Sequence, residues 1–588
     1  MKLTAAQAVV RALEAEGIRH AFGIPGTHNI ELYDALASSD RVRPVLVTDE
    51  QSASFMADGY WRASGRLACV NLVPGAGLTH ALSGIAEAYL DNVPLLVLAC
   101  GIRLESDRAY QLHDVDQMAI ASPVVKAALR AVRREEVYRT VRGACALARR
   151  GVPGPVLVEI PADHYLARDA VEQQPAEAVS ADPPELEREL LLRALEILES
   201  ADRTLLYLGF GAAGAADRLV ALAERLESPV ATTIQGKGVF PESHPLFLWP
   251  GFGHAAPPFA RRVAEDCNAT LAIGCRFSEV GTGSYGLRPP GPLVHVDIDP
   301  DVPGRNYDAA VAIAGDARVV VEALLEELRP RPANAALRER IARGHSEVRQ
   351  PRGGASDGVS PAGLLSALQA SYPAETIYAA DSGNGTFLAM EGLRLEAPGR
   401  FLAPVDYSCM GYAVPAAIGA SLARPGCPVV ALPGDGAFLM TGLELLTAVR
   451  EGTSTAVFVL RDRELAQISQ FQDIALSRRT SSELPPYDLA ALAGAVGVAF
   501  RRLSCDAEVE EVVRWSASRV AEGCPALIEV DVDYSEKTFF TRGVVRAVFG
   551  RLSWSDRLRF LGRALGRRVG GVSEPRQEAA GPETKPGG

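Results

Sequence analysis

The sequence predicts an α/β fold of three domains, each a doubly wound parallel sheet. The chain has 588 residues, which is about three or four domains by length alone. With 48% hydrophobic residues it can bury several cores. Short apolar runs end in glycine-rich turns that precede helical patterns, as in βαβ units. Two polar, proline-rich stretches separate three such α/β segments and are predicted to be linkers.

The predicted boundaries follow from these linkers. We expect an N-terminal domain over 1–170, a linker over 171–187, a central domain over 188–345, a second linker over 346–358, a third domain over 359–535 and a C-terminal extension over 536–588. No tandem repeat is apparent, although the first and third domains are expected to share a fold.

The third domain contains one βαβ unit that can be placed from its pattern. The apolar run 429–432 predicts a buried strand, 440–450 a helix that ends at Gly452, and 456–460 a second strand. Such crossovers are right-handed and join parallel strands. Asp435 and Asp462 therefore fall at the carboxyl edge of the sheet, where α/β folds bind ligands.

This edge predicts a divalent-metal site for a diphosphate. Gly434 and Gly436 flank Asp435 and let backbone N–H groups approach phosphate oxygens. Mg²⁺ takes carboxylates together with phosphate. A Gly-Asp-Gly alone is usually an ordinary turn, so the order of elements around it carries the prediction. The candidate metal ligands are Asp435, Asp462 and Glu464.

The elements follow one another as a strand, Gly-Asp-Gly, a helix, a strand and then a second carboxylate or amide. This order resembles the cofactor motif of thiamine-diphosphate-dependent enzymes. The resemblance runs from about Thr4 to about Asp533 and is closest to the acetolactate-synthase-like branch. The chain is also similar to benzaldehyde lyase and 2-hydroxyacyl-CoA lyase. Ala437 replaces the family's Ser, and Arg461-Asp462 replaces its Asn-Asn, which keeps an oxygen donor. The resemblance implies thiamine diphosphate and Mg²⁺ as cofactors, with pyrimidine-binding, central Rossmann-like and diphosphate-binding domains in that order.

Glu50 is the leading catalytic residue that the resemblance implies. It follows Thr48-Asp49, where the family commonly has His in place of Asp49, and precedes an apolar helix face. In this family a carboxylate hydrogen-bonds N1′ of the cofactor's pyrimidine and so promotes loss of the thiazolium C2 proton. An isolated Glu at a strand end would otherwise be a solvated charge.

Further segments resemble the walls of the family's cofactor site. Met410, in Ser408–Tyr412, matches the bulky residue beneath the thiazolium, although a buried Met is more often core. Val73 stands where the family's Gly-Pro-Gly loop has its first Gly. The cofactor-binding residues implied by the resemblance are Pro25, Gly26, Glu50, Pro74, Gly75, Gly383, Asn384, Met410, Gly434, Asp435, Gly436, Ala437 and Asp462.

The central domain carries its own motif, a GxGxxG over 209–214 after the strand-like run 204–208. This fingerprint also suits a nicotinamide dehydrogenase, but the acidic ribose ligand expected about 20 residues later is missing. In the branch that the chain resembles, this domain holds a non-redox FAD, an ADP-like group in relatives, or nothing. A bare Rossmann-like domain stays open as an alternative.

Composition excludes several other classes. A net charge of −12 and a pI near 5.4 argue against nucleic acid. No apolar run of about 18 residues and no signal peptide are present, so we expect a cytoplasmic protein without a membrane partner. Nine cysteines without CxxC spacing predict reduced thiols. The Arg-rich stretch 551–568 predicts a basic amphipathic helix, packed on its own protein or lying on an anionic partner, before a polar tail.

The resemblance implies decarboxylation of a 2-oxo acid and ligation of the acyl carbanion to an acceptor, with pyruvate as the expected donor. An acyloin or 2-hydroxyacyl lyase is the alternative, and a non-catalytic nucleotide-binding relative is the third reading. The family pairs the pyrimidine side of one subunit with the diphosphate side of another, which implies a homodimer or homotetramer.

Two histidines complete the candidate catalytic set. His28 lies in a segment similar to one of benzaldehyde lyase that places a His beside the reacting carbonyl. His113 lies where the branch often has Gln, in the loop that also contains Gln117. An imidazole there could hand a proton to a product alkoxide, or both could be structural histidines. The candidate catalytic residues are Glu50, His28, His113 and Gln117.

Overall fold

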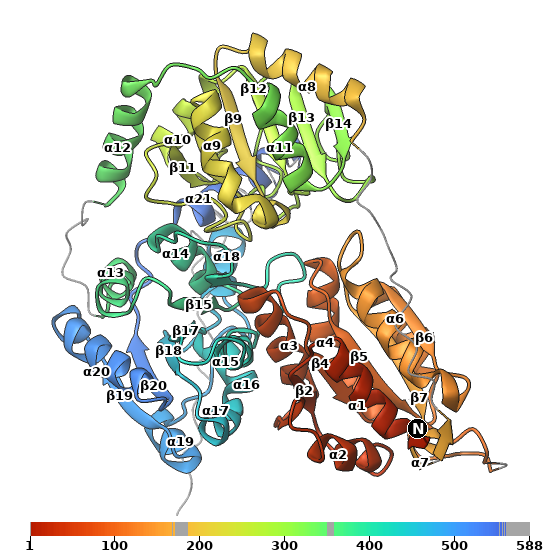
Figure 1. Cartoon of the computed structure of the whole chain (residues 1–588). Coiled ribbons are helices and arrows are strands. Elements are labelled where there is room, and N and C mark those ends of the chain that lie inside the picture. The colour runs from red at the N-terminus through yellow and green to blue at the C-terminus, as the bar shows by residue number, and fades with distance from the viewer. Residues whose placement is uncertain are drawn as a thin grey trace, which may run out of the picture.

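The computed structural model describes residues 2–166 except 107, 168–170, 186–349, 358–551 and scattered positions between 553 and 562. Within this part of the chain there are three six-stranded parallel sheets and one antiparallel pair, β1 (Lys2–Thr4) with β8 (Arg168–Ala170). Figure 1 shows the central domain at the top, the first domain at the lower right and the third at the lower left. The predicted α/β class with three doubly wound parallel sheets is confirmed.

The first sheet has the strand order β3-β2-β4-β5-β7-β6. Its strands are β2 (His20–Gly23), β3 (Arg43–Leu46), β4 (Cys69–Leu72), β5 (Leu96–Gly101), β6 (Ala127–Arg130) and β7 (Val156–Pro161). Its helices are α1 (Ala5–Ala15), α2 (Ile30–Ala37), α3 (Glu50–Ser64), α4 (Ala76–Leu90), α5 (Gln117–Ala121), α6 (Val137–Arg149) and α7 (Ala162–Leu166). Strands β4, β5 and β7 are buried throughout, as near-continuous apolar strands of a covered parallel sheet should be.

The third sheet repeats this topology, with the order β16-β15-β17-β18-β20-β19. Its strands are β15 (Ile377–Ala380), β16 (Phe401–Leu402), β17 (Val429–Leu432), β18 (Thr455–Arg461), β19 (Ala499–Leu503) and β20 (Ala526–Asp531). Its helices are α13 (Pro361–Ser371), α14 (Asn384–Gly392), α15 (Ala413–Ala423), α16 (Asp435–Thr441), α17 (Leu445–Glu451), α18 (Ala466–Leu476), α19 (Leu489–Val496) and α20 (Val509–Ala521). Counted within each domain, both sheets run 2-1-3-4-6-5, so the two domains share a fold as predicted.

The central sheet has a different order, β11-β10-β9-β12-β13-β14, which is the 3-2-1-4-5-6 order of dinucleotide-binding folds. Its strands are β9 (Thr204–Leu208), β10 (Val230–Thr232), β11 (Phe247–Pro250), β12 (Ala269–Ile273), β13 (Leu293–Asp297) and β14 (Val311–Ala314). Its helices are α8 (Arg188–Ser200), α9 (Ala216–Leu226), α10 (Pro258–Glu265), α11 (Ala317–Glu327) and α12 (Ala335–Arg349). The last of these continues into the range predicted as a linker.

Helices α3 and α15 join the first and third domains. They cross so closely that a Cβ on Gly59 would lie 2.2 Å from the Ala416 carbonyl oxygen, and one on Gly419 would lie 2.0 Å from that of Met56. One hydrophobic core runs through this crossing, from Phe55 and Tyr60 to Tyr412 and the strands of both sheets. The two domains therefore pack as one body.

The helix after the Gly-Asp-Gly turn differs from its prediction. It begins at Asp435 rather than Met440, bends through a 3₁₀ turn (Gly442–Glu444) and continues as α17. The turn residues that suggested a loop form the first turn of the helix, because Gly434 is extended at its N-cap and Asp435 begins it. The flanking strands lie where the apolar runs predicted them.

The C-terminal part of the described chain is helix α21 (Phe539–Arg551). Phe540 stacks on Phe387 of the third domain at 4.1 Å, and Gly543 lies against Ala255 of the central domain. The described residues leave out most of the predicted basic helix 551–568. They also leave out most of the two predicted linkers. No helix in the part described is long and apolar enough to cross a membrane.

Candidate active site

Glu50 lies at the carboxyl edge of the first sheet, at the first position of α3. Asp49 caps this helix by accepting a hydrogen bond from the Gln51 N–H at 2.8 Å. The Glu50 side chain is buried, and its Oε2 lies 3.3 Å from Nδ1 of the exposed His80. A Cβ on Gly77 would lie 3.2 Å from Glu50 Oε1, so a glycine there leaves room for the carboxylate.

The glycine turns around Glu50 pack on one another. A Cβ on Gly26 would lie 2.4 Å from the Val73 side chain, and one on Gly77 would lie 2.8 Å from it. Two glycines thus make space for Val73, which stands where the family has Gly. Pro74 precedes Gly75, whose φ of +58° an L-residue adopts only with strain. Pro25 leads into the Gly26 turn, whose N–H donates to Asn29 Oδ1 at 2.8 Å.

Gln117 is buried behind the Gly75 turn. Its Oε1 accepts from the Gly75 N–H at 3.1 Å, and its Nε2 donates to the Cys100 carbonyl at 2.9 Å and to Glu159 at 2.7 Å. Both ends of the amide are therefore engaged within the protein, and the side chain supports the turn.

His28 and His113 meet at the same edge. Their rings lie 5.5 Å apart in an edge-to-face arrangement, and the backbone of His113 approaches Gly75. Burial, followed by the nearby His113, lowers the pKa of His28. A neutral imidazole that can accept or donate a proton is the form expected at neutral pH.

The third sheet brings the predicted metal ligands together at its own carboxyl edge. Asp435 is buried; its carboxylate accepts from the Gly436 N–H at 2.9 Å and the Arg463 N–H at 2.8 Å. Burial, followed by the neighbouring carboxylates of Asp435 and Glu464, raises the pKa of Asp462 to about 7. Glu464 also forms an ion pair with Arg479, with 2.7 Å between Oε2 and Nη1.

This donor set fits a divalent cation. Asp435 and Glu464 disfavour the charged form of buried Asp462, an ion between these carboxylates would offset that repulsion, and oxygen ligands are those that Mg²⁺ takes. Asp435 and Asp462 would hold the ion, with Glu464 at the margin. A Cβ on Gly434 would meet nothing within 4 Å, so the turn leaves open space for a phosphate.

Met410 reaches this turn from the segment between β16 and α15. A Cβ on Gly436 would lie 3.6 Å from Met410 Cε and 2.5 Å from Leu465, so Gly436 makes room for both. Ala437 follows and is buried. Gly383, with φ +123°, caps the helix that Asn384 begins. Buried Asp381 ties this turn to the Met410 segment by accepting from the Gly411 and Ala413 N–H groups at 2.9 and 2.8 Å.

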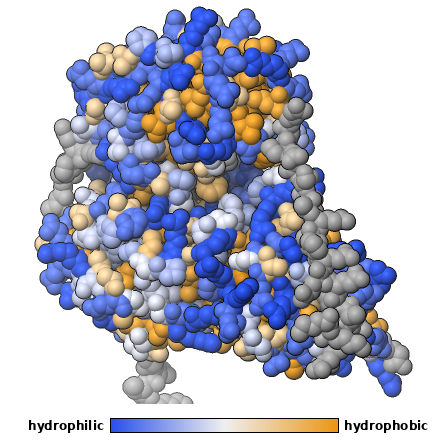
Figure 2. Space-filling model, viewed as in Figure 1, coloured by the Kyte–Doolittle hydropathy of each residue, from blue (hydrophilic) through white to orange (hydrophobic). Residues whose placement is uncertain are grey.

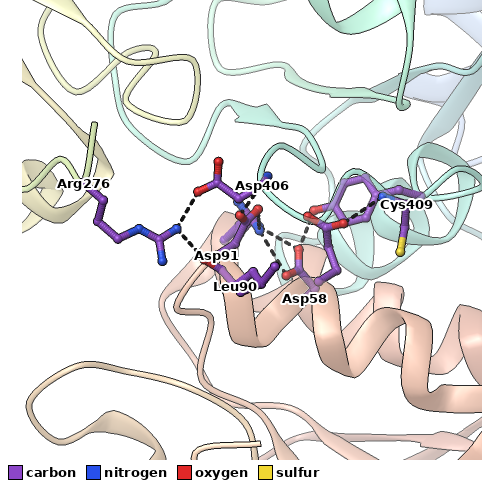
Figure 3. Close-up of polar contacts among 9 residues, drawn as sticks. Asp58, Leu90, Asp91, Arg276, Asp406 and Cys409 are labelled. Atoms are coloured by element: carbon purple, nitrogen blue, oxygen red, sulfur yellow. Dashed lines mark hydrogen bonds and ion pairs between the residues drawn. The ribbon is translucent and has the colours of Figure 1, made fainter. Parts of the chain in front are cut away.

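Several polar residues near the site were not predicted. Figure 3 shows a network where the three domains meet: Arg276 of the central domain reaches Asp406 and the Leu90 carbonyl. Asp58 lies on α3, and Asp91 directly follows α4. Arg62 pairs with Asp58 at 2.7 Å and with Asp91 at 2.8 Å. In the sequence, the four-residue spacing of Asp58 and Arg62 on one helix could have indicated this ion pair.

A cavity of about 600 Å³ opens beside this network. It is lined by the 209–214 turn, by Arg276, Asp297 and Asp316 of the central domain, and by residues of the other two domains. Figure 2 shows the surface hollowed where the central domain meets the rest of the chain. A cavity of this size at the switch point of a 3-2-1-4-5-6 sheet suits a nucleotide.

Comparisons with known proteins agree with this geometry. Three family models match: thiamine pyrophosphate enzyme, N-terminal TPP binding domain, over 3–120; the central domain over 191–324; and the C-terminal TPP binding domain over 381–530. A probable acetolactate synthase large subunit of Methanocaldococcus jannaschii is 32% identical over 90% of this chain and 92% of its own. The probable 2-ketoarginine decarboxylase AruI of Pseudomonas aeruginosa is 35% identical over 87% and 91%.

A third relative, acetolactate synthase isozyme 3 large subunit of Escherichia coli, is 31% identical over 91% of this chain and 96% of its own. These matches argue against the hypothesis of a non-catalytic relative that only binds a nucleotide. The chain therefore belongs to the thiamine-diphosphate-dependent enzymes, in the acetolactate-synthase-like branch, and catalyses the transfer or cleavage of carbon–carbon bonds.

Proposed function

We propose that this enzyme decarboxylates a 2-oxo acid and ligates the acyl group to an acceptor, with pyruvate as donor. The observation that carries the proposal is its similarity over about nine-tenths of the chain to relatives named as acetolactate synthases and as a 2-ketoarginine decarboxylase. Both names denote chemistry on 2-oxo acids. The residues at the two carboxyl edges fit that chemistry.

Each edge has its own task in this proposal. Bound thiamine diphosphate supplies the electron sink that makes loss of CO₂ feasible. Asp435 and Asp462 would hold Mg²⁺, and the 434–436 turn would face the diphosphate. Met410 would pack against the thiazolium ring. The buried carboxyl group of Glu50 would hydrogen-bond the pyrimidine ring nitrogen.

Cleavage of an acyloin is the second candidate. The observation in its favour is the His28–His113 pair, which sets two imidazoles at the edge that carries Glu50. One of them can take a proton from the hydroxyl of a 2-hydroxy ketone during cleavage, or return it during ligation.

A second copy of the chain completes the site in this proposal. The outer face of α16 and α17 exposes a run of apolar side chains that no described segment covers: Leu439, Met440, Leu443, Leu446 and Val449. Five exposed apolar side chains on one helical face indicate an interface. If Glu50 and Asp435 of different subunits serve one cofactor, a mixture of Glu50→Gln and Asp435→Ala chains should regenerate up to about a quarter of the sites. A monomer by sedimentation would refute the dimer.

The cavity beside the central domain is proposed to take a nucleotide, as FAD or an ADP group. Its glycine turn offers backbone N–H groups, and Arg276 lines it. Absorbance of the purified protein distinguishes a flavin from a colourless nucleotide.

A substrate panel with mass-spectrometric detection of products tests the function. The enzyme, supplied with thiamine diphosphate and Mg²⁺, should consume pyruvate and yield acetolactate. Turnover of aromatic acyloins without any 2-oxo acid would favour the second candidate. Turnover of a larger 2-oxo acid to an aldehyde alone would remove ligation from the proposal.

A further inference from the structure

Two buried glutamates outside the cofactor residues, Glu87 and Glu444, lie on corresponding helical segments of the first and third domains, three residues out of register. The domains share an offset: β17 (Val429–Leu432) begins 360 residues after β4 (Cys69–Leu72). The close-packed glycines, Gly59 and Gly419, are also 360 residues apart. Gly59 lies against Ala416, three residues before Gly419, and Gly419 lies against Met56, three residues before Gly59. Glu50 and Met410 keep this offset too, each following the second strand of its domain.

Each glutamate contacts the loop that carries the other domain's cofactor residue. Glu444 Oε1 accepts from the Thr48 N–H at 2.9 Å, the Thr48 hydroxyl at 2.6 Å and the Asp49 N–H at 3.2 Å. Glu87 Oε2 accepts from the Cys409 N–H at 2.9 Å. Asp49 immediately precedes Glu50, and Cys409 immediately precedes Met410. A glutamate of the third domain thus accepts from the first domain's loop, and a glutamate of the first domain accepts from the third domain's loop.

Neither glutamate has another evident task. Both side chains are fully buried, and neither contacts the Asp435 carboxylate. Glu444 Oε2 accepts from the Thr447 hydroxyl at 2.7 Å, while Glu87 Oε1 has no partner among the described residues. Burial, followed by Asp91, raises the pKa of Glu87 to about 9, and burial raises that of Glu444. A neutral carboxyl group still accepts an N–H bond, and Gln matches it in shape.

We propose that Glu444 and Glu87 are reciprocal positioning residues: Glu444 fixes the loop that aims Glu50, and Glu87 fixes the loop that aims Met410. The inference rests on the proposed function, which places Glu50 and Met410 against the cofactor. Each domain thereby sets the geometry of the other domain's cofactor residue. The bonded loops are tied to the opposite sheet by contacts that span more than 320 residues of sequence.

Amide hydrogen exchange in the cofactor-free protein tests the contacts directly. Glu444→Met keeps the length of the side chain and removes its oxygens. It should speed exchange of the Thr48 and Asp49 amides by about tenfold or more, as for a buried donor left unsatisfied, and leave the Cys409 amide unchanged. Glu87→Met should do the reverse. Acceleration of both loops in both variants would overturn the reciprocal assignment.

Functional readouts test the positioning. Glu444→Met should slow deuterium exchange at C2 of bound thiamine diphosphate about tenfold or more, with cofactor affinity within about threefold of wild type. Glu87→Met should instead weaken cofactor affinity. Glu444→Gln and Glu87→Gln, which keep an acceptor oxygen, should restore both values. Glu242→Gln is the matched control, because Glu242 is a buried carboxylate paired with Lys237 in the central domain.

The outcomes separate this inference from the function beneath it. If Glu50→Gln leaves C2 exchange at the wild-type rate, the proposed function fails, whatever the glutamates do to amide exchange. If Glu50→Gln is slow but folded Glu444→Met is not, the positioning role is overturned. Should Glu444→Met fail to fold, Thr48→Val removes one donor to Glu444 and should still slow C2 exchange by a smaller factor. A wild-type rate in that variant would contradict the inference.

Discussion

The first and third domains have the same strand order, the same close-packed helix and the same bond from a buried glutamate, yet opposite chemistry at their carboxyl edges. The first edge carries one buried carboxylate, Glu50, beside imidazoles. The third carries three carboxylates, at Asp435, Asp462 and Glu464. A shared fold fixes where an edge lies; the residues placed on it decide whether it handles a proton or a cation.

The largest effect should follow from removing the cation edge. Asp435→Ala removes a carboxylate that receives two backbone N–H bonds and faces the phosphate turn. We expect Mg²⁺-dependent binding of thiamine diphosphate to be lost, measured by calorimetric titration. Undiminished binding would show that the third edge is not the metal site.

The proton edge should respond differently. Glu50→Gln should preserve the fold and most of the cofactor affinity while lowering turnover by about 10²-fold or more, as for loss of a proton-transfer partner. Deuterium exchange at cofactor C2 measures this step. If both variants lost affinity alike, the division of labour between the edges would be wrong.

The domains should also differ in acid stability. Burial, followed by Arg43, lowers the pKa of His20, at the start of β2, to about 4, whereas Ile377 begins the equivalent strand β15. Because the folded state prefers neutral His20, its contribution to the free energy of unfolding is complete above pH 6.5 and lost as pH falls to about 4. The loss is on the order of 3 kcal/mol.

His20→Gln should remove this part of the acid dependence. Urea unfolding of wild type and variant at pH 7 and at pH 4.5 gives the loss of unfolding free energy between these pH values for each protein. Equal losses of stability in both proteins would mean that His20 does not titrate between those values.

A smaller effect is expected at the histidine pair. His28→Ala should slow ligation or acyloin cleavage by about tenfold, because an imidazole that passes a proton to the product is lost, and leave cofactor affinity intact. Steady-state kinetics with the best substrate of the panel decides this. Unchanged kcat and KM would leave His28 as a structural partner of His113.

The smallest effect should come from Asp462→Asn. The amide keeps an oxygen ligand and removes one of the mutually repelling charges. Affinity for Mg²⁺ and thiamine diphosphate should change by no more than a few fold. A loss as large as that of Asp435→Ala would show that the charge of Asp462, and not only its oxygen, holds the ion.

Local patterns predicted the strands well. The apolar runs 204–208 and 429–432 coincide with β9 and β17. The helix after Asp435 was misplaced, because glycine and aspartate favour turns and only tertiary structure shows that they begin a helix here. Glu444, Glu87 and Asp381 carry no local signature, since their partners lie in distant parts of the sequence.

The crossing of α3 and α15 has a consequence for chimeric enzymes. Gly59 and Gly419 each lie against the backbone of the opposite helix. A change in the packing face of one helix therefore requires a matching change in the other. Recombination between homologues should therefore succeed when the first and third domains are inherited together from one parent. A grafted central domain would have to keep its own contacts with the other two, among them Arg276 with Asp406, Lys237 with the Leu393 carbonyl and Ser243 with Glu396.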